Sequence, residues 1–277
     1  PGSQSEANGA LYFRIIDPST SAQWMVRVWK TIGAVLTDLP RDHSCFSVEG
    51  IVSRKGYLGE NTIEPVTLEA LIVPPYSVTG VGMARSLYDG TVVNITDSHI
   101  VTYLPPGGVG FFYIEATDRS TGIRVETSSV LPSMGAAVSV VGVISTNSLG
   151  ERIIKQADYS VYGTGVLTPL NMSNREAGLS PLDAGVQRLS TLGLMVRVSG
   201  IVTKADAAQG YLLLDDGSNV NSQDTVSGLK VNYTGILPSV GSRIAVVGVV
   251  ASEMFNGQII RVILARQKPS GIAFIGQ

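Results

Sequence analysis

The sequence predicts an all-β protein that contains two similar small barrels, and three observations support this prediction. A series of short motifs occurs twice in the same order, first from Gly110 and again from Gly210. Glycine is frequent, at 31 of 277 residues, and charged residues make up only 15% of the chain. No stretch has the apolar spacing of a long helix. Together these features favour short, well-packed strands that are joined by turns.

The repeat is visible motif by motif. An apolar strand with an acidic end, Phe111 to Glu115, is matched by Tyr211 to Asp215. In both copies there follow a Gly-Ile/Leu-Arg/Lys-Val strand, a Leu-Pro-Ser-x-Gly turn and a Val-Val-Gly-Val strand. The second copy is six residues longer from Asp215 to Gly228 than the first copy is from Glu115 to Gly122. An internal repeat of this kind indicates two copies of one structural unit.

Each copy predicts five short strands. Proline and glycine in the Leu-Pro-Ser-x-Gly motif are typical of a turn. Gly142 and Gly248 lie inside Val-rich strands, where a glycine often marks a bend in a small barrel. The remaining strands are expected at Thr91–Ile95, Ile100–Thr102 and Arg152–Lys155 in the first copy, and at Met195–Thr203 and Gln258–Leu264 in the second. Five strands with such a bent strand resemble the OB-fold, a partly open Greek-key barrel.

The motif order also resembles that of a known class of proteins. Phe-Tyr-Ile-Glu, Asp118-Arg119, Gly-Ile-Arg-Val, Val-Val-Gly-Val and Gly150 to Ile154 follow one another, and Pro169 to Arg175 joins the two copies. This order, with Leu212 to Ser218, is similar to tandem OB modules of secreted bacterial surface proteins, over roughly Ala84 to Gln267. Fold and export define that class, so the resemblance implies an extracellular setting and no particular reaction.

The predicted domains follow from these motifs. Residues 1–20 are an N-terminal extension, 21–83 a small β domain, 84–168 the first OB-like barrel, and 169–277 the second barrel with an apolar C-terminal tail. Within the small domain, Ser47 to Ser53 weakly matches Arg197 to Thr203. A third, degenerate barrel is therefore the alternative interpretation of that domain.

The charge distribution bears on possible partners. The net charge is −2, and even the most basic segment, after residue 168, has nine basic against seven acidic residues. The basic footprint that is typical of nucleic-acid-binding domains is missing, so no nucleic-acid partner is expected. No stretch of about 20 apolar residues occurs, which predicts no membrane insertion.

Few residues suggest catalytic or metal chemistry. The chain has one cysteine, Cys45, and two histidines, His43 and His99, and it lacks the motifs of nucleotide cofactors and of nucleophilic catalysis. We therefore expect a protein that is not an enzyme and has no cofactor. One loop gathers acidic and amide side chains, and its carboxylates form a weak candidate for calcium: Asp215, Asp216 and Asp224. Polar turns use the same residues to cap backbone groups, which is the alternative interpretation.

A ligand face is a second candidate. OB-folds bind single strands and oligosaccharides on the face of strands 2 and 3, where aromatic rings stack on the ligand. Phe111 and Tyr113 in the first copy and Tyr211 in the second occupy this strand. The strand is apolar on both faces, however, and such strands are usually buried on both sides. Packing against another module or subunit is therefore the simpler interpretation.

Three Asn-x-Ser/Thr triplets are possible glycosylation sites. They begin at Asn94, Asn171 and Asn232. Occupancy of at least one of them would fit the extracellular setting that the resemblance implies.

The two ends of the chain suggest self-association. Ala10 to Ile16 is an apolar strand in which Leu11, Phe13 and Ile15 alternate with Tyr12, and Asp17-Pro18 follows it. It is either an edge strand of its own domain or a strand donated to a neighbouring copy. The C-terminal tail, with Phe274 and Ile275, is also apolar and should dock on this chain or on another.

These observations predict an extracellular structural protein that self-associates by strand exchange, as the protomer of a surface filament. Its expected partners are other copies of itself and, as a further candidate, glycans. The alternative function is a secreted OB-fold module that binds carbohydrate or single-stranded nucleic acid.

Overall fold

The computed structural model describes residues 5–7, 9–16, 23–29, 50–53, 62–64, 76–178, 190–266 and 271–275. Contacts divide the chain into two units, of which the first is Pro1–Tyr76 with Gly90–Val92. The second unit, Ser77–Asp89 with Val93–Gln277, contains two barrels. The domain boundary predicted at residue 169 falls within this second unit and stays a prediction.

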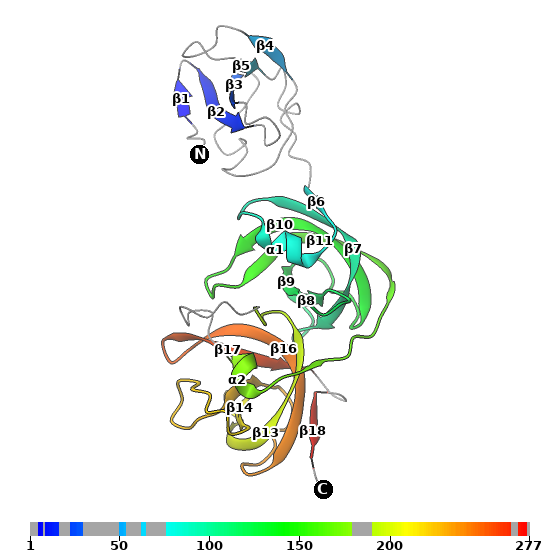
Figure 1. Ribbon diagram of the computed structural model, residues 1–277, viewed down its shortest axis with the longest axis vertical. Helices are drawn as coiled ribbons and strands as arrows, with labels where there is room; N and C mark the ends of the chain where they lie inside the picture. Colours follow the sequence, from blue (N-terminus) through cyan, green and yellow to red (C-terminus); the bar gives the residue numbers. More distant parts are fainter. Residues whose placement is uncertain are drawn as a thin grey trace. The chain divides into compact units, whose positions relative to one another are not determined.

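The first barrel has five main strands (Figure 1). They are β7 (Val92–Tyr103), β8 (Phe111–Glu115), β9 (Gly122–Glu126), β10 (Ala136–Thr146) and β11 (Arg152–Thr164). Their order is β7-β8-β9-β11-β10, and pairing of β10 with β7 closes the barrel. The short strand β6 (Tyr76–Val78) pairs with β7, and helix α1 (Val81–Ser86) contributes Val81 and Ala84 to the core.

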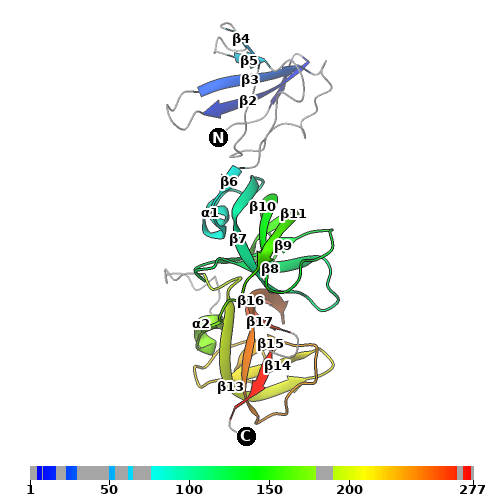
Figure 2. The same cartoon turned by 90° about the vertical axis from the view of Figure 1, so that its right-hand side faces the viewer.

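The second barrel repeats this architecture, as the two orientations in Figures 1 and 2 show. Its strands are β13 (Met195–Asp206), β14 (Tyr211–Asp215), β15 (Leu229–Asn232), β16 (Arg243–Phe255) and β17 (Gln258–Ala265). Their order is β13-β14-β15-β17-β16, and pairing of β13 with β16 closes the barrel. The predictions of an all-β fold and of two OB-like barrels are therefore confirmed.

The repeated motifs place equivalent side chains in the two cores. In β8 the side chains of Phe112 and Ile114 are fully buried inside the first barrel, and Leu212 and Leu214 of β14 are buried inside the second. The period of two in a strand explains this match, because alternate residues face the same side. The side of β8 and the side of β14 that face their barrel cores are therefore both apolar.

The two glycines of the Val-rich strands lie where their backbones are crowded. A Cβ atom on Gly142 would lie 2.5 Å from Ile154 Cγ2, beside an irregularity in the pairing of β10 with β11. A Cβ atom on Gly248 would lie 2.4 Å from the carbonyl oxygen of Leu264. At Gly248, β16 passes from pairing with β13 to pairing with β17. Glycine is used here because a side chain would not fit in the bend of the barrel.

A short helix lies at the start of the second barrel. Strand β12 (Leu170–Asn171) pairs with β13, and α2 (Asn174–Gly178) follows it. The Ser173 hydroxyl accepts a hydrogen bond from the Glu176 amide at 3.2 Å, and the Glu176 carboxylate accepts one from the Ser173 amide at 3.2 Å. This reciprocal capping fixes the beginning of α2. Among the described residues, no helix is long and apolar enough to cross a membrane.

The N-terminal unit contains a sheet with the same strand order. Its strands are β1 (Ser5–Ala7), β2 (Ala10–Ile16), β3 (Gln23–Trp29), β4 (Ile51–Ser53) and β5 (Thr62–Glu64), in the order β1-β2-β3-β5-β4. As in both barrels, the third and fifth strands are parallel. This order agrees with the alternative interpretation of the small domain as a third, degenerate unit of the same kind.

The pairing of β2 corrects the prediction of a donated strand. Ala10 to Ile16 pairs with β1 on one side and along its whole length with β3 on the other. The strand is apolar on both faces because it is an interior strand of its own sheet, where Leu11 and Tyr12 are buried. The side chains of Phe13 and Ile15 lie outside the described residues.

The C-terminal tail docks on its own chain. Ile272 to Phe274 forms β18, which pairs with β16, and Ile272 packs against the core of the second barrel. The tail was expected to dock on this chain or on another, and it docks on this chain. Phe274 and Ile275 remain about half exposed.

Candidate functional site

The outer face of β8, which belongs to the first barrel, is covered by the second barrel. Tyr113 points away from its own core, yet only 1% of its surface is exposed. It forms an apolar cluster with side chains from both barrels: Tyr103, Met195, Val249, Ala251, Ile260 and Val262. Phe111 packs at the margin of this cluster beneath the Arg124 guanidinium, 3.8 Å from the ring centre. The predicted stacking face of the first barrel is thus an interface between barrels.

Two buried carboxylates cross this interface. Glu151 accepts a hydrogen bond from the amide of Ser252 at 2.5 Å and one from the Tyr113 hydroxyl at 3.1 Å. Glu115 is fully buried and accepts one from the amide of Met195 at 2.7 Å. Burial raises the pKa of Glu115 to about 7 and also raises the pKa of Glu151. These carboxylates position the two barrels, which supports the expectation that packing explains the apolar strand.

The corresponding face of the second barrel is covered by a loop. Tyr211 is 2% exposed, and its hydroxyl donates a hydrogen bond to Asp224 at 2.8 Å. Lys204 Nζ lies 2.9 Å from both carboxylate oxygens of Asp224. Burial alone would raise the pKa of Asp224, but the hydrogen bonds from Lys204 and Tyr211 lower it to about 2. The predicted stacking rings of Tyr113 and Tyr211 are therefore covered, and Phe111 is half-buried beneath Arg124.

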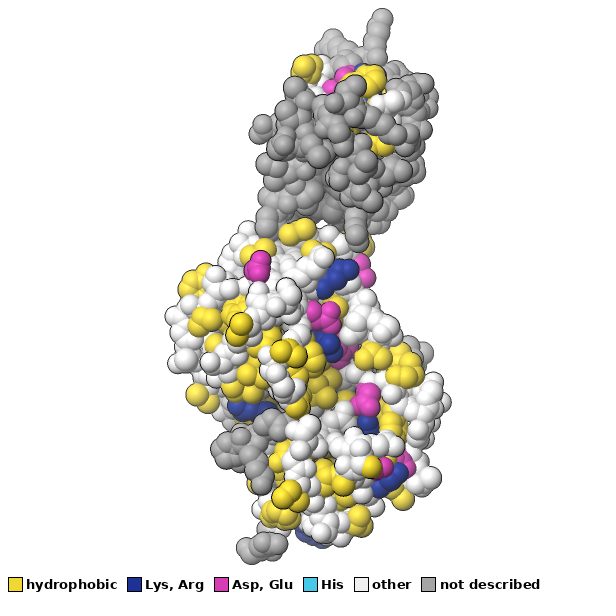
Figure 3. All heavy atoms as spheres, turned by 180° about the vertical axis from the view of Figure 1, so that it is seen from behind, with side chains coloured by type: hydrophobic (Ala, Val, Ile, Leu, Met, Phe, Trp, Pro, Cys, Tyr) yellow, Lys and Arg dark blue, Asp and Glu magenta, His cyan; other side chains and the backbone are white. Residues whose placement is uncertain are grey.

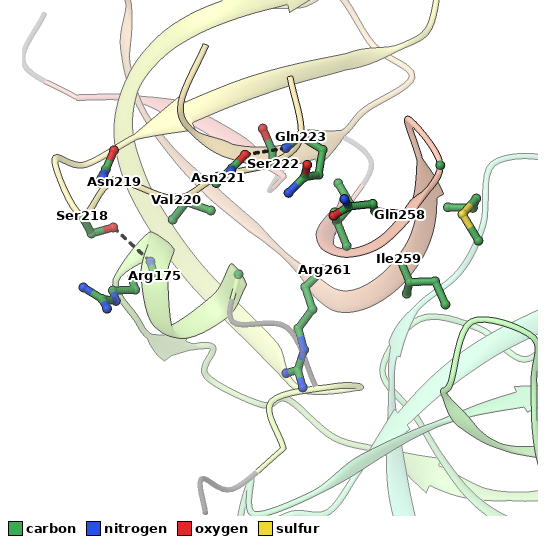
Figure 4. A pocket seen from close by; sticks show the side chains of 14 residues that line it. Arg175, Ser218, Asn219, Val220, Asn221, Ser222, Gln223, Gln258, Ile259 and Arg261 are labelled. Carbon is green, nitrogen blue, oxygen red and sulfur yellow. Dashed lines mark hydrogen bonds between the residues drawn. The ribbon is translucent and has the colours of Figure 1, made fainter. Parts of the chain in front are cut away.

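A cleft lies beside this loop, with a volume of about 780 Å³. In Figure 4, Ser218 to Gln223 form one wall, Arg175 comes from α2, and Gln258, Ile259 and Arg261 come from β17. The turn between β16 and β17 is one of the two loops with which OB-folds hold ligands. The volume is in the range of pockets that bind small ligands.

Eight of the fourteen residues that line the cleft have polar or cationic side chains. The polar side chains are two guanidiniums, four amides and two hydroxyls: Arg175, Arg261, Asn219, Asn221, Gln223, Gln258, Ser218 and Ser222. No carboxylate is among the described residues that line the cleft. The Ser222 hydroxyl is in a side chain that is 3% exposed, and it has no hydrogen-bond partner. A buried hydroxyl without a partner is unusual in a protein interior.

Arg261 adds a buried positive charge at the edge of the cleft. It is 8% exposed, its Nη1 donates a hydrogen bond to the Thr191 hydroxyl, and its Nε has no partner. Burial, with a smaller contribution from the charge of Arg85, lowers the pKa of Arg261 to about 10. The guanidinium therefore stays charged at neutral pH. The Glu151 carboxylate lies near enough to Arg261 to oppose this lowering of its pKa. A guanidinium at the edge of the cleft favours an anionic ligand.

The predicted calcium ligands do not form a site. Asp215 caps the amide of Gly217 at 2.9 Å, and Asp216 accepts hydrogen bonds from the amides of Ser218 and Asn174. Asp224 is paired with Lys204 on the other side of the loop. Among the described residues, no three His, Cys, Asp or Glu side chains gather as metal ligands. The alternative interpretation, turn capping, accounts for Asp215 and Asp216.

The other predicted site residues are dispersed. Asn171 is exposed, Asn94 is half-buried, and the Asn232 side-chain amide donates a hydrogen bond to Glu253 at 2.6 Å. Glycosylation of these positions stays a prediction. His99 is buried and accepts a hydrogen bond from the amide of Val81 at 3.3 Å, while His43 and Cys45 lie outside the described residues.

The surface shows no basic stripe on the face in Figure 3. Among the described residues there, Lys and Arg side chains are scattered singly, several beside Asp or Glu, among apolar and uncharged side chains. The cleft of the second barrel was missed from the sequence because Ser218 to Gln223 and Gln258 to Arg261 are brought together only by the fold. The six-residue extension of that loop was the one available signal.

Comparison with known proteins gives matches in fold only. No protein-family model and no curated protein matches the chain. Among solved structures, the tetrameric p202 HIN2 structure matches 55% of this chain and 79% of its own, at 11% identity and a TM-score of 0.26. The structure of a murine DNA binding protein bound with double-stranded DNA matches 59% of this chain and 93% of its own, at 10% identity and a TM-score of 0.26. The structure of a replication protein A heterotrimer bound to single-stranded DNA matches 95% of this chain and 75% of its own, at 7% identity and a TM-score of 0.20.

Two predictions made from the sequence require correction. The predicted role as a filament protomer that exchanges strands is wrong, because the strand expected to be donated, β2, is an interior strand of its own sheet. The expectation that nucleic acid is no partner is corrected as well, because net charge averages over the whole chain and does not exclude a local pair of guanidiniums in a cleft. At these TM-scores the likeness concerns fold alone, so a ligand must be inferred from this chain's own residues.

Proposed function

We propose that the second barrel binds single-stranded nucleic acid in the cleft between Ser218–Gln223 and Gln258–Arg261. The observation that carries the proposal is the lining of the cleft, which combines two guanidiniums with amides and hydroxyls and contains no carboxylate. Arginine is well suited to phosphate oxygens, and amide side chains hydrogen-bond the edges of bases. The chain acts in this proposal as a binding module, not as an enzyme.

The size and position of the cleft favour a single strand over a duplex. A volume of about 780 Å³ accommodates a small number of nucleotide units. Proteins that read a duplex insert a helix or ribbon into a groove, whereas this site is concave. The cleft also adjoins the turn between β16 and β17, which corresponds to a ligand-binding loop of OB-folds.

The proposal predicts a particular dependence on salt. Two guanidiniums neutralise at most two phosphates, so the logarithm of the association constant should fall with the logarithm of the salt concentration at a slope of about −1.4. Fluorescence anisotropy with a labelled oligothymidylate of about 20 nucleotides measures this slope. Carbohydrate, the other ligand class of OB-folds, is tested in parallel with neutral oligosaccharides. Binding to these, with no binding to the oligonucleotide, would contradict the proposal.

The extracellular location and the closer resemblance to secreted bacterial surface proteins stay predictions. Neither is needed for the binding proposal, which depends only on the cleft.

A further inference from the structure

The loop that forms one wall of the cleft also covers the outer face of the second barrel. We call residues 221–227 the flap. Its base is fixed, because the Gly228 amide donates a hydrogen bond to the Val220 carbonyl at 2.9 Å and Val220 packs in the barrel core. The corresponding connection in the first barrel, between β8 and β9, is only six residues long. The flap therefore belongs to the extension that distinguishes the second copy.

Beneath the flap lie aromatic and cationic side chains on the ligand face of the OB-fold. The rings of Tyr211 and Phe255 meet edge to face, with centres 5.5 Å apart. Lys230 Nζ lies 4.8 Å from the first ring and 4.4 Å from the second, and pairs with Glu253. Lys204 lies beside Tyr211. Aromatic rings next to lysines are the combination with which OB-folds stack bases and hold phosphates.

Few contacts hold the tip of the flap over this face. Asp224 accepts hydrogen bonds from Lys204 and Tyr211, at 2.9 and 2.8 Å. The other hydrogen bonds between the flap and the barrel run from Asn256 to the Gln223 carbonyl at 2.7 Å and from Thr203 to the Ser227 carbonyl at 2.9 Å. Asp224 thus places an anionic oxygen pair on a lysine and a tyrosine hydroxyl, where a phosphate of a bound strand would also fit.

We propose that the flap is a displaceable cover over a stacking surface, and that a single strand bound in the cleft displaces it. A phosphate then takes the place of the Asp224 carboxylate on Lys204, and a base stacks on Tyr211. This inference rests on the proposed binding of single-stranded nucleic acid and adds its regulation. The cleft is the entry point, because Asn221 to Gln223 line it on one side while Asp224 holds the cover on the other.

The substitution Asp224→Asn tests this inference, because it removes the charge that holds the flap. Asp158→Asn is the matched control, since Asp158 is exposed on β11 of the other barrel and has the same charge. We expect Asp224→Asn to bind labelled oligothymidylate at least about fivefold more tightly than the control, because stacking on Tyr211 is no longer opposed. Asp224→Ala serves as a second variant, and circular dichroism checks that both are folded.

Hydrogen exchange of the wild-type chain provides an independent readout. Exchange of amides in residues 221–227 should accelerate when the oligonucleotide is added, because the flap leaves the barrel. If the wild type binds but both Asp224 variants have the affinity of Asp158→Asn, or if exchange in the flap slows, the proposal of a displaceable flap is wrong and the binding proposal stands. If neither the wild type nor any variant binds the oligonucleotide, the binding proposal fails, and the cover with it.

Discussion

Gly122 of the first barrel and Gly193 of the second barrel are in direct backbone contact. A Cβ atom on Gly122 would lie 2.1 Å from the carbonyl oxygen of Gly193. Arg85 lies across the same junction, where its Nη1 donates hydrogen bonds to the carbonyls of Gly122 at 2.8 Å and Leu192 at 2.9 Å. The two barrels are therefore joined by a tight, polar backbone contact beside the apolar cluster around Tyr113.

This contact predicts the effect of a single methyl group. Gly122→Ala should lower the free energy of unfolding by about 2–3 kcal/mol, because backbone atoms must shift to make room. Gly163→Ala is the control, since a Cβ atom on Gly163 would meet no atom within 4 Å. The control should change stability by less than about 0.5 kcal/mol. Urea unfolding of both variants measures the difference, and equal stabilities would show that the barrels are not packed in this way.

Glu115 should make stability depend on pH. Burial raises its pKa in the folded state to about 7 from the ordinary value of 4.5, so the folded protein holds the proton more tightly than the unfolded chain. The associated stability is present below about pH 4.5 and is lost as pH rises towards 7, by a total of about 3 kcal/mol. His99 acts in the opposite direction, because burial lowers its pKa. The difference between the wild type and Glu115→Gln isolates the carboxylate. We expect the wild type to lose stability relative to this variant between pH 5 and 8, and a difference that does not change with pH would contradict the assignment.

The Tyr113 hydroxyl should stabilise the interface through Glu151. Tyr113→Phe removes a buried hydrogen bond to a carboxylate and should cost about 1–2 kcal/mol in the free energy of unfolding. Tyr162→Phe is the control, because Tyr162 is 68% exposed. Chemical denaturation compares the two. A cost at Tyr113 no larger than at Tyr162 would mean that Glu151 is satisfied without the hydroxyl.

The barrels could be predicted from the sequence because their motifs are local and occur twice. Phe112 and Leu212 lie at equivalent positions of matching strands, so the period of two placed both in the cores. The third sheet was harder, because Ser47 to Ser53 was matched with Arg197 to Thr203, which aligns its fourth strand, β4, with the first strand of a barrel, β13. Strand pairing, not local similarity, reveals the common order.

The site could not be predicted because it depends on long-range contacts. Nothing in the local sequence indicates that Arg261 lies opposite Ser222, or that Tyr113 is covered by Met195 and Val249. The apolar pattern on both faces of β8 and β14 did indicate that each strand is covered on its outer face. It could not indicate that the second barrel covers β8 while a loop covers β14.

Arg175 gives the most direct test of binding in the cleft. It lines the cleft from an exposed position on α2, so Arg175→Ala should leave the barrel folded. Arg197→Ala is the matched control, because Arg197 is exposed on β13 of the same barrel and does not line the cleft. In titrations with labelled oligothymidylate, we expect Arg175→Ala to bind about fivefold more weakly than Arg197→Ala, with a salt slope shallower by about 0.7. Equal affinities and equal slopes for the two variants would contradict binding of a single strand in this cleft.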